Sequence, residues 1–466
     1  MRAFNIYADD LNEYIKSGKL GPVNPEEKIG KVRGIRAVEL YADFTFDRAG
    51  QGLFYHGQIR SSNQTFLMAY DCGTIGNKKN LSEIVSRFNK EYILKRQRLG
   101  LLAISHFDLD HISHIPELLR ECKCDTVMLP HIAKEIRAVF FAKFVTEEKE
   151  NGSQEYHRDF SWFFRDPVGY MGEMSGARQI IGIQSDDDYP DDNSSDKNVM
   201  PIKPFYPNES KDSVDSETPQ LLYVGGGKHI QTGENNSDRY FVYSGSPVFR
   251  VEFNRLSWLF KPLNVQDKLP PSFFNDVDRI LCRYEDDWQK LLSNKDAIER
   301  LKNIYDLYIG QGRRNAHSLL LRHEPEQHAR PLASAYIPCK HNCIHCLECC
   351  DLCYRQGFHD NFATILLGDL KLDDKARAVL NEQRFIDYRV KAVLIPHHGA
   401  DSDDLLWLNE KVRGNGSCAS LVVSYGINNR YKHPRFIYDG TMARIKNSIV
   451  FVNEDNEYRY DIFVHG

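Results

Sequence analysis

The chain has 466 residues, of which 41% are hydrophobic and 12% aromatic, so it can bury a core as one large domain with insertions or as two to three smaller ones. Its formal net charge of -5 excludes a strongly basic surface over the whole molecule, and any nucleic acid would need a local basic groove. Residues 1–20 lack the apolar centre of a signal peptide, and no apolar run approaches the roughly 20 residues that cross a bilayer. We therefore expect a soluble cytoplasmic protein whose eleven cysteines form no disulfides and are available to bind metal.

The N-terminal part of the chain alternates predicted strands and helices. In order, we expect a short helix, three strands, a longer helix and a buried strand, over 10–16, 35–41, 53–59, 66–70, 80–98 and 101–104. Asn80 is the expected N-cap of the longer helix. The third strand ends in Asp71-Cys72-Gly73, where Asp71 by itself is more typical of a turn or cap than of a functional site. This order of strand, helix and strand is typical of an α/β fold.

A dense group of polar side chains follows the buried strand, in Ser105-His106-Phe107-Asp108-Leu109-Asp110-His111. Two imidazoles and two carboxylates lie on a loop that leads into a helix predicted over 112–119. Because alternate residues of an extended segment face the same way, one loop can aim these ligands into a common cavity. Four such groups would be costly to bury unpaired, which disfavours an ordinary solvated turn. The motif therefore predicts a metal site.

Residues 125–312 mix several kinds of predicted structure. The expected order is a strand, a helix, an aromatic helical stretch, three short strands and a long charged helix, over 125–129, 132–148, 162–171, 221–224, 240–243, 248–253 and 273–308. Between them, 185–219 is rich in aspartate, serine, asparagine and proline, which is typical of an exposed flexible loop. We favour a solvated loop there over a metal site or a partner site.

Six of the eleven cysteines lie close together, at Cys339, Cys343, Cys346, Cys349, Cys350 and Cys353. Their spacing lets thiolates converge on one tetrahedral ion, so we expect a structural zinc site. Reactive surface thiols and an iron–sulfur centre are the alternatives. A closed four-ligand site would mainly hold together an insertion that is too short to fold on its own core.

The C-terminal part returns to the α/β pattern. Strands are expected over 317–322, 362–367, 390–395, 421–424, 449–452 and 458–464, and a helix over 435–446. Two of these strands end in metal-ligand residue types, in Gly368-Asp369 and in Pro396-His397-His398-Gly399. A third leads to the loop Asn428-Asn429-Arg430-Tyr431-Lys432-His433-Pro434, which offers two cations, two amides and an imidazole.

Taken together, these segments resemble the metallo-β-lactamase superfamily, and in particular the cytoplasmic hydrolase domain of ComEC-type DNA-uptake proteins. The resemblance rests on Gly50-Gln51-Gly52, Asp71-Cys72-Gly73, His106-x-Asp108-x-Asp110-His111, Asn315-x-x-Ser318, Leu367-Gly368-Asp369, Pro396-His397-His398-Gly399 and Asn429-Arg430-Tyr431-Lys432-His433-Pro434. It covers roughly 35–130 and 313–466. Unlike ComEC proteins, this chain has no membrane portion.

The resemblance implies an α/β fold, a four-layer αββα sandwich with its metal site at one edge between the two sheets. An N-terminal extension over 1–34 would precede one metallo-β-lactamase-like domain over 35–466. A large mixed insertion over 131–312, which includes the flexible acidic loop over 185–219, and a Cys/His-rich insertion over 335–360 would interrupt that domain. Either insertion could dock a protein partner.

The resemblance also implies two divalent metals at the active site. The first would be held by His106 and Asp108, and the second by Asp110 and His111. Asp369 would bridge the two ions. Such a pair lowers the pKa of a shared water to near neutrality and polarises an oxygen of the scissile group.

Two positions bear on the identity of the metal and on the remaining ligands. The superfamily's usual histidine is replaced by Asp108, a harder oxygen ligand, so Mn²⁺ or Mg²⁺ becomes credible beside Zn²⁺. His398 is the better candidate for the remaining ligand of the pair, with His397 second. Asn315 or His317 stands near the position of the superfamily's additional histidine, and a structural role for either is equally consistent with the sequence.

The loop at 428–434 would contribute to catalysis beside Asp110. Arg430, Lys432 and His433 could neutralise charge in the transition state or hold a phosphate, and Asn429 could donate a hydrogen bond. The alternative is a structural turn fixed by Pro434, which for Lys432 is equally well supported.

The leading hypothesis is a metal-dependent nuclease or phosphodiesterase, with DNA favoured as substrate through the resemblance. Because fold does not fix substrate, RNA, a small cyclic nucleotide, a lactone or another ester remains an alternative. A hypothesis of another class is a partner-binding regulatory module whose hydrolase site is latent, for instance until cleavage of the 185–219 loop.

Overall fold

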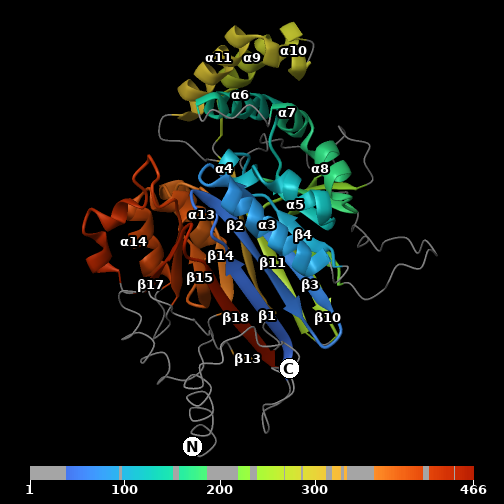
Figure 1. The fold of residues 1–466 in the computed structure, drawn as a ribbon, viewed down its shortest axis with the longest axis vertical. Coiled ribbons are helices and arrows are strands. Elements are labelled where there is room, and N and C mark those ends of the chain that lie inside the picture. The colour runs from blue at the N-terminus through green and yellow to red at the C-terminus, as the bar shows by residue number, and fades with distance from the viewer. Residues whose placement is uncertain are drawn as a thin grey trace, which may run out of the picture.

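The computed structural model of the chain describes most of residues 38–465. The described ranges are 38–93, 97–150, 157–185, 219–230, 239–254, 256–266, 268–284, 287–310, 317–326, 330–332, 362–412, 419–445 and 447–465. Within them, two large sheets of mixed strand direction are accompanied by helices (Figure 1). The α/β class predicted from the sequence is confirmed at this level.

The first sheet contains strands from both ends of the described chain. Its order is β13 (Arg330–Leu332), β18 (Tyr458–His465), β1 (Val38–Phe46), β2 (Gly52–Arg60), β3 (Thr65–Thr74), β4 (Leu99–Ala103), β5 (Cys124–Pro130), β6 (Gln179–Gln184), β9 (Tyr240–Ser244) and β8 (Lys228–Ile230). The strands from β3 to β9 in this order run parallel to one another, and the remaining pairs are antiparallel. Every residue of β4 is buried, as the apolar sequence of a central parallel strand predicts.

The second sheet has the order β17 (Ser448–Val452), β16 (Ser420–Ser424), β15 (Val390–Leu394), β14 (Ala363–Leu366), β12 (His317–Pro325), β11 (Leu256–Gln266), β10 (Val248–Phe253) and β7 (Leu221–Gly225). The strands from β14 to β17 are parallel, and the others are antiparallel. Ligand-binding loops usually lie at the carboxyl ends of parallel strands, and β3, β4, β14 and β15 are strands of this kind.

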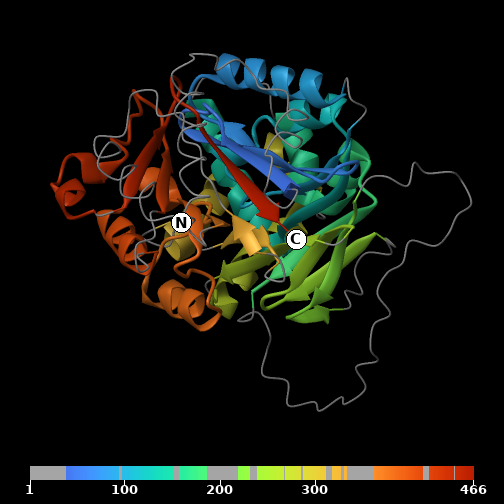
Figure 2. The ribbon, with the colours of Figure 1, turned by 90° about the horizontal axis from the view of Figure 1, so that it is seen from below.

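Three apolar cores hold these elements together. One consists of strand residues from both sheets, including Phe44, Tyr70 and Trp258, so the sheets pack face to face. A second joins the first sheet to helices such as α3 (Lys78–Ile93), α5 (Ile115–Glu121) and α8 (Pro167–Ser175). The third joins the second sheet to α13 (Asp374–Glu382) and α14 (Ser402–Lys411). Figure 2 shows α3 in blue on the opposite side of the strands from these two helices in orange.

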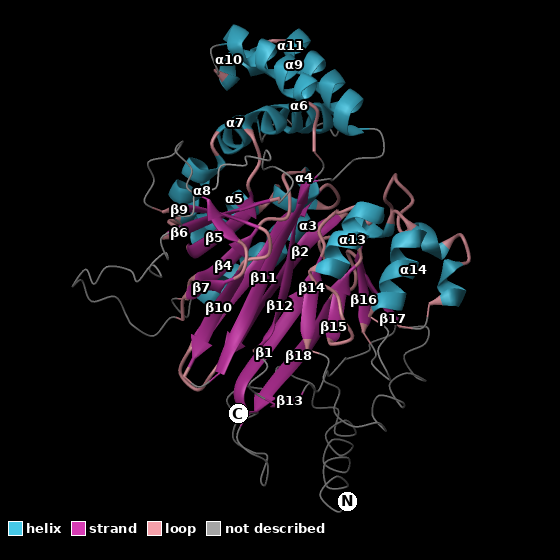
Figure 3. Cartoon of the chain, turned by 180° about the vertical axis from the view of Figure 1, so that it is seen from behind, coloured by secondary structure: helices cyan, strands magenta, loops and turns pink. Residues whose placement is uncertain are grey.

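A group of helices lies beyond one end of the strands (Figures 1 and 3). It comprises α6 (Lys134–Glu150), α7 (His157–Arg165), α9 (Pro271–Leu281), α10 (Trp288–Ser293) and α11 (Lys295–Tyr305). The helices pack on one another through aromatic side chains, for example Phe141 against Trp288 and Phe140 against Tyr305. We call this group the helical cap.

The range 131–312, expected as one insertion, also supplies strands to both sheets. The strands β6, β8 and β9 extend the first sheet, and β7, β10 and β11 extend the second. Pro262 lies inside β11, opposite Leu321 of β12. Proline removes a ladder hydrogen bond and is usually found at sheet edges, so a proline at this position hides a central strand from sequence-based prediction. Of this range, the helices of the cap lie outside the sheets.

Several predicted helices are wrong in their extent: the stretches over 112–119 and 162–171 are each divided between two helices. Three others differ for a local reason that the structure shows. The long helix over 273–308 is broken because Asn294 caps a new helix, its side chain accepting a hydrogen bond from the Ala297 amide at 3.0 Å. The helix over 435–446 is replaced by the short 3₁₀ turns η5 (Arg435–Ile437) and η6 (Thr441–Arg444), separated by Gly440 at φ +78°. The helix α3 begins before Asn80, because Asn77 accepts a hydrogen bond from the Asn80 amide.

Several predictions fall outside the described residues: the 1–34 extension with its helix over 10–16, most of the 185–219 loop, and the cysteine segment. Among the helices that the structure describes, none is long and apolar enough to cross a membrane.

Candidate metal centre

The site is built where strands of both sheets reach their carboxyl ends. From the first sheet, β4 leads to His106, and the one-turn helix α4 (Leu109–Ile112) carries Asp110 and His111. From the second sheet, β14 leads to Asp369, and β15 leads through the turn η4 (Pro396–Gly399) to His398. These five residues, from separate sequence motifs, therefore come together in space.

Two glycines of the quoted motifs let α4 approach the sheet. A Cβ on Gly73 would lie 2.6 Å from backbone atoms of His111, and a Cβ on Gly52 would lie 2.8 Å from the carbonyl oxygen of Asp110. Real Cβ atoms do not tolerate such contacts, so only glycine allows the ligand-bearing helix to pack this closely.

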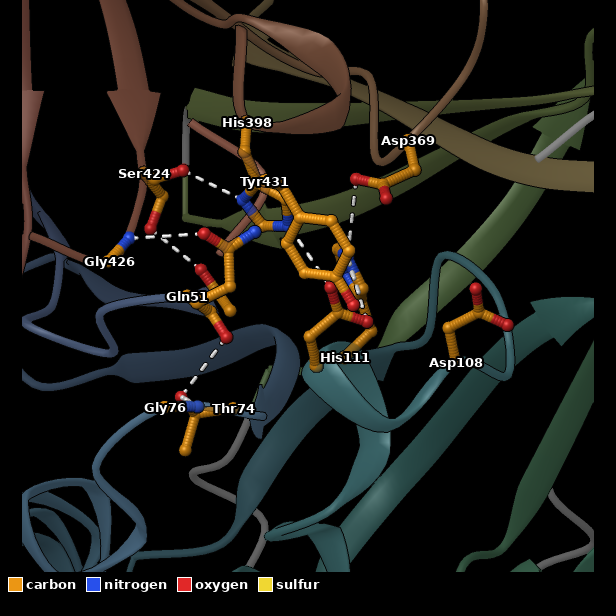
Figure 4. A network of polar contacts seen from close by, with 12 residues as sticks. Gln51, Thr74, Gly76, Asp108, His111, Asp369, His398, Ser424, Gly426 and Tyr431 are labelled. Carbon is orange, nitrogen blue, oxygen red and sulfur yellow. Dashed lines mark hydrogen bonds and ion pairs between the residues drawn. The ribbon is translucent and has the colours of Figure 1, made fainter. Parts of the chain in front are cut away.

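Four ligand atoms, from Asp110, His111, Asp369 and His398, lie within 4.8 Å of one another. His111 Nε2 is 3.3 Å from Asp369 Oδ1, and His398 Nε2 is 3.1 Å from Asp110 Oδ2. Figure 4 shows His111, Asp369 and His398 converging on the same space. Two imidazoles and two carboxylates at this spacing are able to hold one divalent ion. We call these four residues the main ligand group.

A second possible group, of His106, Asp108 and Asp110, adjoins the first and shares Asp110 with it. The rings of His106 and His111 have their centroids 4.0 Å apart. His106 Nε2 also lies 3.9 Å from Asp369 Oδ2. The two groups therefore form one continuous cluster.

Two nitrogen atoms in the cluster face the Asp369 carboxylate without making a hydrogen bond of ordinary geometry. Among the described residues, the Nε2 atoms of His106 and His111 are buried and make no hydrogen bond. A buried polar atom that makes no good hydrogen bond costs free energy, which coordination of a metal ion would recover. The residues present therefore fit a metal ion, with the Nε2 atoms of both histidines placed to act as ligands.

The charges of the main ligand group reinforce one another. Burial lowers the pKa of His111, but the carboxylates of Asp369, Asp110 and Asp71 outweigh it and hold that pKa well above its ordinary value. Burial also lowers the pKa of His398, but Asp369 and Asp110 outweigh the effect of burial and raise that pKa above its ordinary value. Burial raises the pKa of Asp369, but the neighbouring imidazoles hold it well below its usual range. This arrangement of carboxylates favours positive charge at the position where a metal would bind.

His111 is oriented from behind by Asp71. Its Nδ1 lies 2.8 Å from Asp71 Oδ2, and the Asp71 carboxylate also accepts hydrogen bonds from the amide and hydroxyl of Ser105, at 2.7 and 2.6 Å. The same hydroxyl lies 2.8 Å from His106 Nδ1. These contacts turn the Nε2 atoms of both histidines into the cluster. From the sequence, Asp71 by itself is expected to have a turn or cap role. The feature that indicates a functional role is its place within the Asp71-Cys72-Gly73 motif.

His398, rather than its neighbour, reaches the main ligand group. Its Nδ1 donates to the carbonyl of Ser424 at 2.7 Å, which leaves Nε2 for a ligand. Both histidines have left-handed backbone, with φ of +51° for His397 and +53° for His398. His397 is half-buried, and its ring faces His433 at a centroid distance of 5.7 Å. The structure thus separates two histidines that the sequence could only rank.

Asp108 has a further neighbour that the sequence does not predict. Its Oδ2 accepts a hydrogen bond from Lys143 Nζ of the cap helix α6 at 2.6 Å. Figure 4 shows Asp108 set apart from His111 and Asp369. Asp108 can join the second group by distance, but in this structure its carboxylate is paired with an ammonium. Nothing in the sequence links Lys143 to this site.

The loop at 428–434 lies beside the histidine turn. The Asn429 side chain accepts a hydrogen bond from the His433 amide and donates to the carbonyls of His433 and Gly426, at 3.0, 2.8 and 2.6 Å. Asn429 therefore holds the loop together, and its predicted hydrogen bond to a substrate would have to break these contacts. The cis peptide before Pro434 completes the turn.

Three side chains of this loop form a stack that leads outward from the site. The Arg430 guanidinium lies over the Tyr431 ring at 5.0 Å, and Tyr431 stacks on His433 at 5.8 Å with 12° between the planes. Burial and the adjacent His397 lower the pKa of His433 to about 4. His433 is therefore neutral at pH 7, so Arg430 and the exposed Lys432 are the cations of this loop.

Some predicted site residues lie outside the part of the chain that the structure describes. These are Asn315, the side chain of His317, and the cysteines of the expected zinc site. The chain matches no protein-family model and no curated protein.

Proposed function

We propose that the protein is a metal-dependent hydrolase of the metallo-β-lactamase type, and that it cleaves phosphodiester bonds of nucleic acid, with DNA favoured. The observation that carries the proposal is the main ligand group, Asp110, His111, Asp369 and His398, together with the buried Nε2 atoms of His106 and His111, which make no hydrogen bond. Packed apolar structure has no use for such a buried cluster.

The arrangement of the cores supports the finer fold assignment, a four-layer αββα sandwich. One core lies between the sheets, and each sheet has a further core with its own helices. The ligands come from the carboxyl ends of strands in both sheets, as the resemblance predicts. The proposal of the family rests on this arrangement and on the motifs, taken together.

When bound, a divalent metal such as Zn²⁺ or Mn²⁺ would supply an activated water and a Lewis acid for the phosphoryl oxygen. The roles left to the chain are binding and charge compensation. Asp110 belongs to both ligand groups and so joins them, while Asp71 and the Ser424 carbonyl fix the ligating histidines. Each of the two groups could hold one ion, so a fully loaded site would hold two.

The stack beside the site supports a nucleic-acid substrate over a small ester. Tyr431 is 39% exposed and is accompanied by Arg430 and Lys432, which are also exposed. An exposed aromatic ring next to cations is able to stack on a base while the cations contact phosphates. The ring contacts from Tyr431 through His433 to His397 connect this surface with the ligand turn.

The test is hydrolysis by Mn²⁺-loaded protein of linear duplex, circular and single-stranded DNA, of RNA, and of cyclic nucleotides. An Asp110→Ala/His111→Ala variant should lose turnover on whichever substrate is cleaved. An Asp296→Ala/His229→Ala variant changes the same residue types outside the cluster and should keep it. Equal turnover in all three proteins would remove the proposed site. Cleavage of cyclic nucleotides alone would replace nucleic acid as the substrate class.

A further inference from the structure

The helical cap places a cation beside the cluster of candidate metal ligands. Lys143, on α6, donates from Nζ to Asp108 Oδ2 at 2.6 Å, and the two side chains are 14% and 20% exposed. A charge-assisted hydrogen bond of this length between partly buried groups is strong. Helix α6 belongs to the range for which the resemblance offers no counterpart, so this contact is a property of this chain's own cap.

The cap also holds Lys143 in place. Its ammonium lies 5.3 Å from the centre of the Tyr305 ring on α11, at cation–π distance. Tyr305 is itself fully buried and packs against Phe140, one turn before Lys143 on α6. The position of the ammonium is therefore set by packing within the cap, and it is not that of a lysine sampling solvent.

The two ligand groups differ in what this cation does to them. Asp108 is a member of the second group, with His106 and Asp110, and its carboxylate already carries a positive partner. The main ligand group does not include Asp108, and its two histidines are oriented by Asp71 and by the Ser424 carbonyl. A divalent ion entering the second group would lie near the ammonium and would have to compete for Asp108.

We propose that Lys143 sets the number of metal ions that the site holds: the main ligand group binds one divalent ion tightly, and Lys143 supplies the second positive charge beside Asp108. An ion occupies the second group only when the ammonium leaves that carboxylate. The inference rests on the metal centre of the proposed function, but it concerns occupancy rather than hydrolysis. Lys143 acts here as a positioning residue.

The experiment counts bound Mn²⁺ by electron paramagnetic resonance during titration of the full chain. Mn²⁺ is chosen because thiolates favour softer ions, so the cysteine segment does not add to the count. The variants are Lys143→Met, which keeps the length without the charge, and Lys143→Arg, which keeps the charge. Lys134→Met, at the exposed start of the same helix, is the matched control. Thermal unfolding of each variant verifies that it is folded.

Wild type, Lys143→Arg and Lys134→Met should each bind one Mn²⁺ tightly, and a second at least tenfold more weakly. Lys143→Met should bind two with similar affinity and show the spectrum of an exchange-coupled pair. Two equally tight ions in wild type, or an unchanged count in Lys143→Met, would overturn the inference. Absence of Mn²⁺ binding in every protein would overturn the metal centre as well. A raised count without hydrolysis would leave the inference standing and count against the proposed function.

Discussion

His111 Nδ1 and the Asp71 carboxylate are 2.8 Å apart and both side chains are inaccessible to solvent. Asp71 lies in β3 and has a left-handed backbone conformation, with φ of +55°. Non-glycine residues adopt this conformation at a cost, which the three contacts to the carboxylate offset. The orientation of the His111 ring is therefore fixed by the protein itself.

Replacing Asp71 by Asn should weaken metal binding by about 10–100-fold, the usual effect of removing an outer partner of a ligating histidine. Isothermal titration with Mn²⁺ measures the change. Asp47→Asn breaks another buried carboxylate–histidine pair, with His56 at 3.0 Å, outside the cluster. Its metal affinity should stay at the wild-type value, and equal losses in both variants would indicate a general structural effect.

The two adjacent histidines should behave differently. His398→Ala removes a member of the main ligand group and should reduce Mn²⁺ affinity by more than the roughly 10–100-fold expected for an outer partner. His397→Ala should leave the affinity within a factor of a few, because His397 faces His433 instead. The reverse order of effects would show that the turn is arranged differently when metal is bound.

Gly73→Ala should disturb the ligand helix. The added Cβ would meet the His111 backbone at 2.6 Å, so the variant should lose about 1–3 kcal/mol of unfolding free energy and bind Mn²⁺ more weakly. Gly172→Ala, on α8, meets only Ile180 Cδ1 at 3.6 Å and should be neutral or slightly stabilising. Urea unfolding and Mn²⁺ titration of both variants provide the comparison.

Buried His323 should make stability depend on pH. Trp258 Nε1, which can only donate, lies 3.2 Å from His323 Nδ1, so His323 Nε2 carries the proton and donates to Tyr55 Oη at 2.8 Å. Burial lowers the pKa of His323 from 6.5 to about 3. The unfolded chain therefore binds more protons than the folded one between these values, and stability falls as pH drops below 6.5.

Between pH 7.5 and pH 5, this histidine alone should cost about 2 kcal/mol of unfolding free energy, at about 1.4 kcal/mol per pH unit below 6.5. Urea unfolding of wild type and His323→Gln at both pH values isolates the term, because the other titrating groups are common to both. The loss should be about 2 kcal/mol smaller in His323→Gln. Equal losses in the two proteins would mean that the burial of His323 does not govern this range.

Removing metal should lower the melting temperature. An ion at 100 times its Kd stabilises the folded state by about 2.7 kcal/mol, since the assembled ligands exist only there. Scanning calorimetry with Mn²⁺ and with EDTA should separate the two states for wild type and leave Asp110→Ala/His111→Ala unchanged. A shift in the double variant as large as in wild type would place the stabilising ion elsewhere.

The sequence predicts the local parts of the site well, because one loop carries four potential ligands and two later strands end in Asp369 and His398. Strands with continuous apolar sequence, such as β4 and β15, are also found at their expected places. The sequence does not show which residues that are far apart in the chain come into contact. Lys143 is an ordinary helical lysine until the fold brings it to Asp108, and Asp71 is an ordinary strand-end acid until His111 lies behind it.

The same limit explains the elements that were missed. The strand β11 contains Pro262, and its place between β10 and β12 comes from its neighbours rather than from its own propensity. The break in the predicted helix at 273–308 depends on a cap at Asn294 that a charged helical pattern conceals.

Asp110 and His398 touch although 288 residues separate them in the chain. During synthesis, the loop with His106, Asp108, Asp110 and His111 would leave the ribosome long before Asp369 and His398 do. Until the later strands have joined the second sheet, Asp110 and His111 lack Asp369 and His398, the other two members of the main ligand group. We therefore expect the proposed metal ion to bind tightly only after the later strands have folded, and a prematurely terminated chain should lose the ion to a competing chelator.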